Sequence, residues 1–384
     1  MIHLVIREPI GYQRTLCHAL NYYYRGDFIA WFASGCESEF RTGDGFNRHF
    51  LAEIGFRKLF GALRTDREAV VILGGWSSPL AYKTLLITTL LRVPTLIWAD
   101  HPRPRQRTSA FEALRRTYLR LLSRRAICFL ACGTPTVEHL AALGISRNKI
   151  FNFPYWVDVP TEWSPPSRVS DEDSAAGPLR LLAVGRLAPE KGFDNAIEAL
   201  ALANANASRA VAELLIIGDG PECERLEHLV NSLDVRSSVA FTGRLENATV
   251  FEHLRNSDAL VVPSEFEPYG VVVLEALAHG RPVLASDKVI AAIDRDDSSG
   301  AIRFHSVGDA DQLAEQIKQL AHDPVALRNA SQAARAIAEA WKPHRAAEIL
   351  QGILNDRLQR GTDSLDHDPQ NIYQQKPQPT SDAS

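Results

Sequence analysis

The sequence predicts an α/β protein built from two doubly wound domains, each with a parallel sheet. The chain has 384 residues, of which 45% are hydrophobic and 23% charged, so it is long enough for two buried cores. In each half, short β-branched or aromatic runs alternate with longer helical patterns. Strands that alternate with helices require right-handed crossovers, which produce a parallel sheet covered on both faces.

The first domain is expected over residues 1–160. Its predicted strands are the apolar runs IHLVI, FIAWFA, VVILGG, VPTLIW and AICFLAC. Helical patterns such as PLAYKTLLITTLLR lie between them and supply the crossovers.

A linker is expected over residues 161–178, where Pro, Ser and acidic residues are concentrated. The second domain follows over residues 179–341, with the predicted strands LRLLAVG, ELLIIGDG, SVAFTG, DALVVPS and RPVLAS. Two Rossmann-like domains are therefore expected to face each other across a cleft.

The C-terminal part reads as helix over residues 309–358, interrupted at Pro324 and Pro343. We expect the helix in residues 342–360 to return to the N-terminal domain. Residues 361–384 lack apolar periodicity and are expected to be disordered.

Neither a signal peptide nor a transmembrane segment is expected, because the apolar run TLLITTLLRVPTLIWA is interrupted by Arg92 and Pro94. Cys128 and Cys132 lie in a strand-like run without nearby histidines, which favours buried thiols over a metal site. The cysteines form no disulfide framework, so a reducing cytoplasm is the expected compartment. They are Cys17, Cys36, Cys128, Cys132 and Cys223.

Charge is distributed unevenly along the chain. Residues 1–160 hold 21 Lys and Arg against 12 Asp and Glu, whereas the remaining residues carry a net charge of −13. The first half, at +9, is expected to face a different partner from the second.

The turn GRLAPEKG follows the first strand of the second domain. Gly185 stands where the strand turns, and Arg186 and Lys191 bring two cations to the carboxyl edge of the sheet, where doubly wound folds bind ligands. A planar guanidinium and a point-charge ammonium together suit a diphosphate.

The next loop, IIGDGPECERL, argues against an NAD site. A dinucleotide fingerprint needs three glycines, and only Gly218 and Gly220 are present, with Cys223 in the third position.

Two glutamates stand in the stretch SEFEPYGVVVLEALAHGRPVLAS. A helix is expected to begin near Tyr269, with Pro268 tolerated at its first position, so that Glu267 precedes the helix and Glu275 lies in its second turn. The free N–H groups of Gly270, Val271 and Val272 are expected to form an anion site. The two carboxylates beside it are suited to accept from hydroxyl groups, as a sugar nucleotide would offer.

Together, GRLAPEKG, IIGDGP, FTGRL and the E-x7-E motif resemble the donor domain of the retaining glycosyltransferases of GT-B fold, often called family 4 or glycosyl transferases group 1. The resemblance covers nearly the whole second half. It implies a nucleotide-diphosphate sugar as donor, a saccharide or lipid-linked hydroxyl acceptor, and no metal or other cofactor.

Residue roles follow from this resemblance by position. Arg186 and Lys191 would bind the donor diphosphate and stabilise the leaving group, and Glu267 would contact the transferred sugar. Glu275 would accept from the ribose, and Arg244 and Leu245 would border the base. Gly185, Gly218, Gly270 and Val271 complete the expected donor site.

The first domain contributes fewer matches. Gly11 is the one glycine in the loop where relatives often have a glycine-rich turn, and it is included in the donor site. Asp100 and His101 follow a strand at the place where relatives often contact the sugar, so a catalytic role is expected for both. Ile290 stands where the family pattern has glycine, which leaves the donor's identity open.

An arginine-rich run, residues 101–125, admits two interpretations. Phe111, Leu114, Tyr118 and Leu121 fall on one helical face, which either packs on the sheet or contacts a membrane. In the membrane interpretation, an anionic membrane surface is contacted by Arg115, Arg116, Arg120 and Arg124. It predicts a peripheral location on the inner face of the plasma membrane. No nucleic-acid recognition motif accompanies these arginines, so nucleic acid is not an expected partner.

The expected function is therefore transfer of a hexose-type sugar in the biosynthesis of a cell-surface polysaccharide or glycolipid. Two alternatives stay open. A nucleotide-sugar 2-epimerase would use the same diphosphate contacts on the donor alone, and a non-catalytic nucleotide-sugar binding protein would show no turnover.

Overall fold

The computed structural model describes residues 1–359 except 9–10, 36–44, 104–107, 167–176 and 206. The predicted disordered tail, the central part of the predicted linker, Cys36, Arg105 and Arg107 lie outside the described residues. Two compact units divide the chain, one formed by Met1–Trp156 with Lys342–Ser384, the other by Val157–Trp341.

The first unit has a parallel sheet whose described strands run in the order β3-β2-β1-β4-β5-β6-β7. β1 is buried along its whole length, as expected for a central strand covered on both faces. The strands are β1 Ile2–Ile6, β2 Phe28–Phe32, β3 Asn47–Phe50, β4 Val70–Gly74, β5 Thr95–Ala99, β6 Cys128–Ala131 and β7 Ile150–Asn152.

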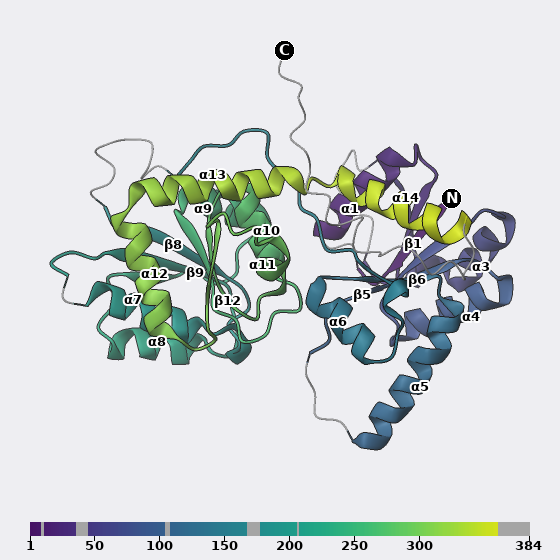
Figure 1. The fold of residues 1–384 in the computed structure, drawn as a ribbon, viewed down its shortest axis with the longest axis horizontal. Coiled ribbons are helices and arrows are strands. Elements are labelled where there is room, and N and C mark those ends of the chain that lie inside the picture. The colour runs from purple at the N-terminus through teal and green to yellow at the C-terminus, as the bar shows by residue number, and fades with distance from the viewer. Residues whose placement is uncertain (9–10, 36–44, 104–107, 167–176, 206, 360–384) are drawn as a thin grey trace, which may run out of the picture. The chain divides into compact units, whose positions relative to one another are not determined.

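Helices connect and cover these strands, and α14 packs beside α1 although more than 300 residues separate them in sequence (Figure 1). Helix α4 begins at Pro79 behind Ser78, whose side chain accepts from the N–H of Ala81. The α-helices of this unit are α1 Gly11–Tyr23, α2 Leu51–Ile54, α3 Phe56–Thr65, α4 Pro79–Leu91, α5 Ser109–Arg125, α6 Thr134–Ala142 and α14 His344–Gln359, with a 3-10 turn at Arg147–Lys149.

The second unit repeats the architecture with a parallel sheet in the order β10-β9-β8-β11-β12-β13. Its strands are β8 Leu179–Val184, β9 Ala212–Ile217, β10 Val239–Phe241, β11 Ala259–Val262, β12 Val283–Ser286 and β13 Ile302–His305. Its helices are α7 Phe193–Asn204, α8 Cys223–Ser232, α9 Asn247–Asn256, α10 Val271–Ala278, α11 Ile290–Arg295, α12 Ala310–His322 and α13 Pro324–Ala340, with the 3-10 helix η5 at Pro189–Lys191.

Every strand predicted from the sequence is present, and the predicted fold class is correct. Three described strands, β3, β7 and β13, were not predicted, and all three are edge strands. β3 reads NRHF and β13 reads IRFH, so polar side chains interrupt the apolar pattern by which a strand is recognised.

Helix α5 corrects one prediction. Leu114 and Leu121 are 67% and 55% exposed, so these two residues of the predicted apolar face do not pack on the sheet. Tyr118 does pack against the core, and the Phe111 side chain lies outside the described part of the structure. Leu119 and Leu122 are buried instead, on the neighbouring side of the helix. Among the described helices, none is long and apolar enough to cross a membrane.

Candidate functional site

A pocket of about 510 Å³ opens at the carboxyl edge of the second sheet, where the loops after β8, β9 and β10 meet. Open parallel sheets bind their ligands at this edge. Six residues predicted from the sequence line it: Gly185, Arg186, Gly218, Arg244, Leu245 and Glu275. Asn247, Val250 and Phe251 line it as well and were not predicted, because a helical pattern alone does not show that α9 borders the pocket.

Two loops that line this pocket approach each other closely through their backbones, at Gly185 and Gly218. Gly218 has φ +149°, and a Cβ placed on it would lie 1.8 Å from the carbonyl oxygen of Gly185. No side chain fits there, so glycine is required for the loops after β8 and β9 to approach each other. Arg186 and Arg244, both exposed, add two cations to the same pocket.

Lys191 and Glu267, which the sequence placed in different loops, form an ion pair beside this edge. Lys191 Nζ lies 2.5 Å from Glu267 Oε2, and the Ser264 hydroxyl lies 3.4 Å from the same oxygen. Both charged side chains are largely buried, with 18% and 13% of their surface exposed.

Backbone hydrogen bonds hold the two loops of this ion pair together. The carbonyl of Glu190 in η5 accepts from the N–H groups of Glu265 and Phe266 at 3.0 and 3.2 Å. Glu267 also forms a parallel bridge with Val289, which precedes α11. Both partners of the ion pair are thus positioned by rigid backbone contacts.

Gly270 separates Glu267 from helix α10. It has φ +100°, and a Cβ there would contact Glu267 Cγ and Val289 Cγ1, each at 3.1 Å. The left-handed conformation delays the helix, so α10 begins at Val271 and not near Tyr269 as predicted. Pro268 therefore stands outside the helix. The N–H of Val273 donates to the Gly270 carbonyl at 3.0 Å, so the predicted anion site is left to the N–H groups of Val271 and Val272, at the start of the helix.

Glu275 lies in the second turn of α10, on the side that lines the pocket. Burial raises the pKa of its carboxyl to about 7, because desolvation disfavours the charged form. A half-buried carboxyl poised near neutrality is suited to accept a hydrogen bond from a ligand hydroxyl.

Ile290 begins α11 and is 3% exposed. Its side chain packs into the unit, so the residue that departs from the expected glycine fills a core position. The N–H of the next residue, Ala291, donates to the carbonyl of Tyr269 at 2.7 Å.

The first unit carries its own polar cluster at the carboxyl edge of its sheet. Asp100, an exposed residue, follows β5, and the Tyr155 hydroxyl donates to its Oδ1. Burial raises the pKa values of Tyr155 and of the Cys132 thiol well above their ordinary values, so both stay protonated and can donate to the carboxylate. The ring of Tyr12 lies 4.3 Å from that of Tyr155 at an interplanar angle of 53°, and the pKa of Tyr12 is raised to about 12, mainly by burial.

Sequence reasoning missed Tyr12, Cys132 and Tyr155 in this cluster. The signal that could have found Tyr155 is its place in FPYWV, directly after the last strand of the first sheet. Gly11 is the first residue of α1, next to Tyr12.

His101 belongs to a second group of side chains in this unit. Its ring lies 5.5 Å from that of His139, and burial lowers its pKa. Arg115 Nη2 lies 3.3 Å from His139 Nε2, and the Arg115 side chain is 11% exposed. Arg115 therefore faces the protein interior and does not belong to the exposed cationic face on which it was predicted.

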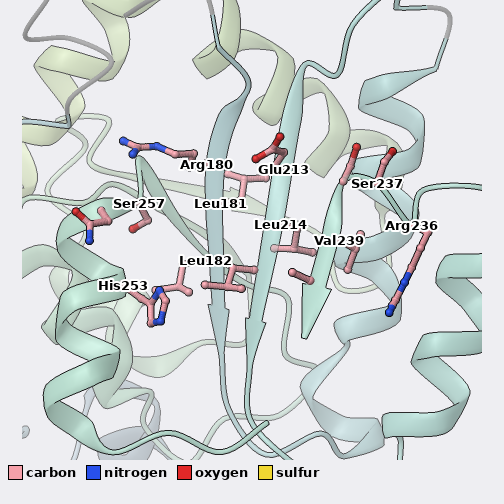
Figure 2. A pocket seen from close by; sticks show the side chains of 14 residues that line it. Arg180, Leu181, Leu182, Glu213, Leu214, Arg236, Ser237, Val239, His253 and Ser257 are labelled. Atoms are coloured by element: carbon pink, nitrogen blue, oxygen red, sulfur yellow. The ribbon is translucent and has the colours of Figure 1, made fainter. Parts of the chain in front are cut away.

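A second pocket, of about 370 Å³, lies at the opposite half of the second sheet (Figure 2). Arg180 and Glu213, near the beginnings of β8 and β9, are among its lining residues, with Arg236 before β10. Arg180 is engaged with Asp258, at 2.9 Å between Nη2 and Oδ1. None of the sequence motifs reaches this pocket, which favours the carboxyl-edge pocket as the functional one.

No group of three or more His, Cys, Asp or Glu side chains suited to a metal ion occurs among the described residues. Cys128 and Cys132 are both fully buried. The proposed independence from metal stays a prediction.

Residues 169–337 match the family model of the Glycosyl transferases group 1. A similar curated protein is an uncharacterized glycosyltransferase of Methanocaldococcus jannaschii, 39% identical over 28% of this chain and 26% of its own length. Another is the lipopolysaccharide core biosynthesis glycosyltransferase LpsD of Rhizobium meliloti, 34% identical over 42% of this chain and 44% of its own length. The chain thus spans less than half the length of these relatives.

Solved structures match over nearly the whole chain. Anabaena HepE in complex with UDP has a TM-score of 0.75 at 17% identity, covering 92% of this chain and 99% of its own. Sucrose-phosphate synthase of Thermosynechococcus elongatus has a TM-score of 0.69 at 18% identity, covering 94% and 99%. These likenesses confirm the GT-B class of fold, with two Rossmann-like parallel-sheet domains.

Proposed function

We propose that this protein is a retaining glycosyltransferase that moves a sugar from a nucleoside-diphosphate donor to a hydroxyl acceptor. The observation that carries the proposal is the convergence of cations, close-packed glycines and two carboxylates on the carboxyl edge of one parallel sheet. This edge belongs to the part of the chain that matches the Glycosyl transferases group 1 model.

The chemistry follows from charge. A departing nucleoside diphosphate develops negative charge, and Arg186, Lys191 and the first turn of α10 supply fixed positive charge and N–H donors at the edge where it would lie. Lys191 is paired with Glu267. A bound diphosphate would draw the ammonium toward itself and release the Glu267 carboxylate to accept from sugar hydroxyls.

Glu275 would accept from the nucleotide ribose, with Arg244 and Leu245 at the base. In the first unit, Asp100 would accept from the acceptor hydroxyl or the sugar. The name of LpsD, a lipopolysaccharide core biosynthesis glycosyltransferase, supports a role in a cell-surface polysaccharide or glycolipid, with a saccharide or lipid-linked acceptor. No metal is assigned to the reaction, because the cations of the site would carry the charge.

Product analysis tests this proposal. The protein is incubated in chelator with a panel of UDP- and GDP-linked sugars, with and without a mixture of glycan and glycolipid acceptors. We expect release of the nucleoside diphosphate from one donor, faster with acceptor, and a product whose anomeric configuration matches the donor's. Conversion of a donor into its epimer without acceptor would establish the epimerase instead, and nucleotide binding without any turnover would establish a binding protein.

A further inference from the structure

A ridge of exposed apolar side chains runs along helix α4. Tyr82, Leu86 and Leu90 are 53%, 61% and 67% exposed, and their spacing of four residues places them on one side of the helix. Single exposed leucines are common on protein surfaces, but a continuous row of them marks an interaction surface.

Helix α5 extends this ridge. Its exposed leucines, Leu114 and Leu121, flank Tyr118, which is partly buried and packs against the core; the Tyr118 ring lies 6.2 Å from that of Tyr82. The two helices therefore approach each other at this tyrosine pair. We call this surface the α4–α5 ridge: Tyr82, Leu86, Leu90, Leu114, Tyr118 and Leu121.

Cations border the ridge. Arg116, Arg120 and Arg124, three exposed residues spaced four apart on α5, form a row beside the leucines, and Arg125 and Lys83 are exposed as well. Helix α4 contains no acidic residue. The one acid of α5, Glu112, lies 3.6 Å from the inward-facing Arg115.

We propose that the α4–α5 ridge docks this unit on an anionic lipid bilayer. Leucine and tyrosine side chains would enter the headgroup region of the bilayer, while the arginine row would bind the lipid phosphates there. A second copy of the chain fits less well, because a two-fold interface through this ridge would bring the arginine rows of both copies together. This inference deepens the proposed function by naming the location of the acceptor: a lipid-linked molecule presented at the membrane surface.

Vesicle co-sedimentation with the full chain tests the docking surface without any donor or acceptor. Vesicles of phosphatidylcholine alone are compared with vesicles that also contain phosphatidylglycerol, at low and high salt. Three variants are measured beside the wild type: Leu86→Ser with Leu90→Ser, Arg116→Gln with Arg120→Gln and Arg124→Gln, and the control Leu202→Ser with Val325→Ser. The control removes exposed apolar residues of the other unit.

We expect the wild type and the control to bind phosphatidylglycerol vesicles, with binding reduced by salt. The leucine and arginine variants should each lose at least about tenfold in partitioning while keeping the wild-type melting temperature. Absence of wild-type binding, equal binding to neutral vesicles, or full binding by the leucine variant would each overturn the proposal. So would a wild-type dimer in solution that the leucine variant dissociates, since a second copy would then cover the ridge.

The proposed transferase function can fail separately. Vesicle binding by a protein that shows no response to any nucleotide would leave the docking surface standing and reject the transferase. A nucleotide response without vesicle binding would do the reverse.

Discussion

Lys191 Nζ lies 2.5 Å from Glu267 Oε2, and this contact joins a residue after β8 to a residue after β11. The ion pair sits where the proposed donor diphosphate and sugar would meet. In the proposed mechanism, the phosphates of the ligand compete with Glu267 for the Lys191 ammonium. The hydroxyls of the ligand then donate hydrogen bonds to the Glu267 carboxylate.

The two partners of this ion pair are predicted to differ in what they bind. Lys191→Met should lower the affinity for a free nucleoside diphosphate at least about tenfold, because it removes a cation from the phosphate site. Glu267→Gln should leave that affinity within about threefold but reduce turnover of the nucleotide sugar by about 10² or more. Calorimetric titration measures the affinity for the nucleotide, and a separate assay measures the turnover of the nucleotide sugar. Equal losses of nucleotide affinity in both variants would contradict the assignment.

Glu275 predicts a pH dependence of stability. Its pKa is raised from the ordinary 4.5 to about 7 in the folded state, so the folded protein binds a proton between these values that the unfolded chain releases. The buried carboxylate therefore destabilises the protein fully above pH 7, and this penalty disappears as the pH falls toward 4.5. Glu275→Gln should thus be more stable than the wild type at pH 8, by roughly 3 kcal/mol, and nearly equal to it below about pH 4.

Chemical denaturation at several pH values measures this difference. The control is Glu252→Gln, an exposed glutamate of α9, which should show no such trend. At neutral pH, Glu275→Gln should also weaken nucleotide binding, because the amide replaces one acceptor oxygen with a donor. A stability difference that does not change with pH would contradict the raised pKa of the Glu275 carboxyl.

Gly218 is predicted to tolerate no side chain. Gly218→Ala should destabilise the protein by about 2–4 kcal/mol, since its Cβ would overlap the Gly185 carbonyl oxygen, which is backbone and cannot turn aside. Gly243→Ala is the matched control: it also has a positive φ, +72°, but no atom lies within 4 Å of the added carbon. It should cost only about 1–2 kcal/mol. Similar costs for both in urea denaturation would mean that the loops are not in close contact.

Tyr155 is predicted to position Asp100 and not to bind the donor. Tyr155→Phe removes the hydroxyl that donates to Asp100 Oδ1. If the proposed function holds, the variant should lose about tenfold in kcat/KM for the acceptor, with unchanged affinity for the nucleotide. Thr95→Val, which loses a side-chain hydrogen bond to the Val93 carbonyl in the same unit, is the control for a purely structural effect. A loss of the same size in both variants would assign Tyr155 a structural role.

Most of the fold could be predicted from the sequence, because buried parallel strands appear in it as continuous apolar runs. β4 and β6 are examples, with VVIL and CFLA fully buried. The strands that were missed, such as β3, are short and half-exposed, so their pairing comes from the neighbouring strand and leaves little local pattern.

The donor-side residues were also recognisable, because each follows a strand whose carboxyl end is fixed by the topology. The start of α10 was placed two residues too early, because Gly270 adopts a left-handed conformation, φ +100°, where an added Cβ would meet Val289, a residue distant in sequence. Arg115 shows the same limit. Helical periodicity predicts that neighbouring arginines share a surface, but the contact of Arg115 with His139 is a tertiary one.

The central claim is that the carboxyl-edge pocket of the second unit binds a nucleoside diphosphate. A thermal-shift panel in chelator tests it most directly, with UDP, GDP, ADP, CMP and NAD added to the wild type, Arg186→Ala and Arg236→Ala. Arg236 is the matched control, because it is exposed and lines the opposite pocket. We predict that one nucleoside diphosphate raises the melting temperature of the wild type and of Arg236→Ala but not of Arg186→Ala. A response only to NAD, no response at all, or a response lost in Arg236→Ala and kept in Arg186→Ala would contradict the account.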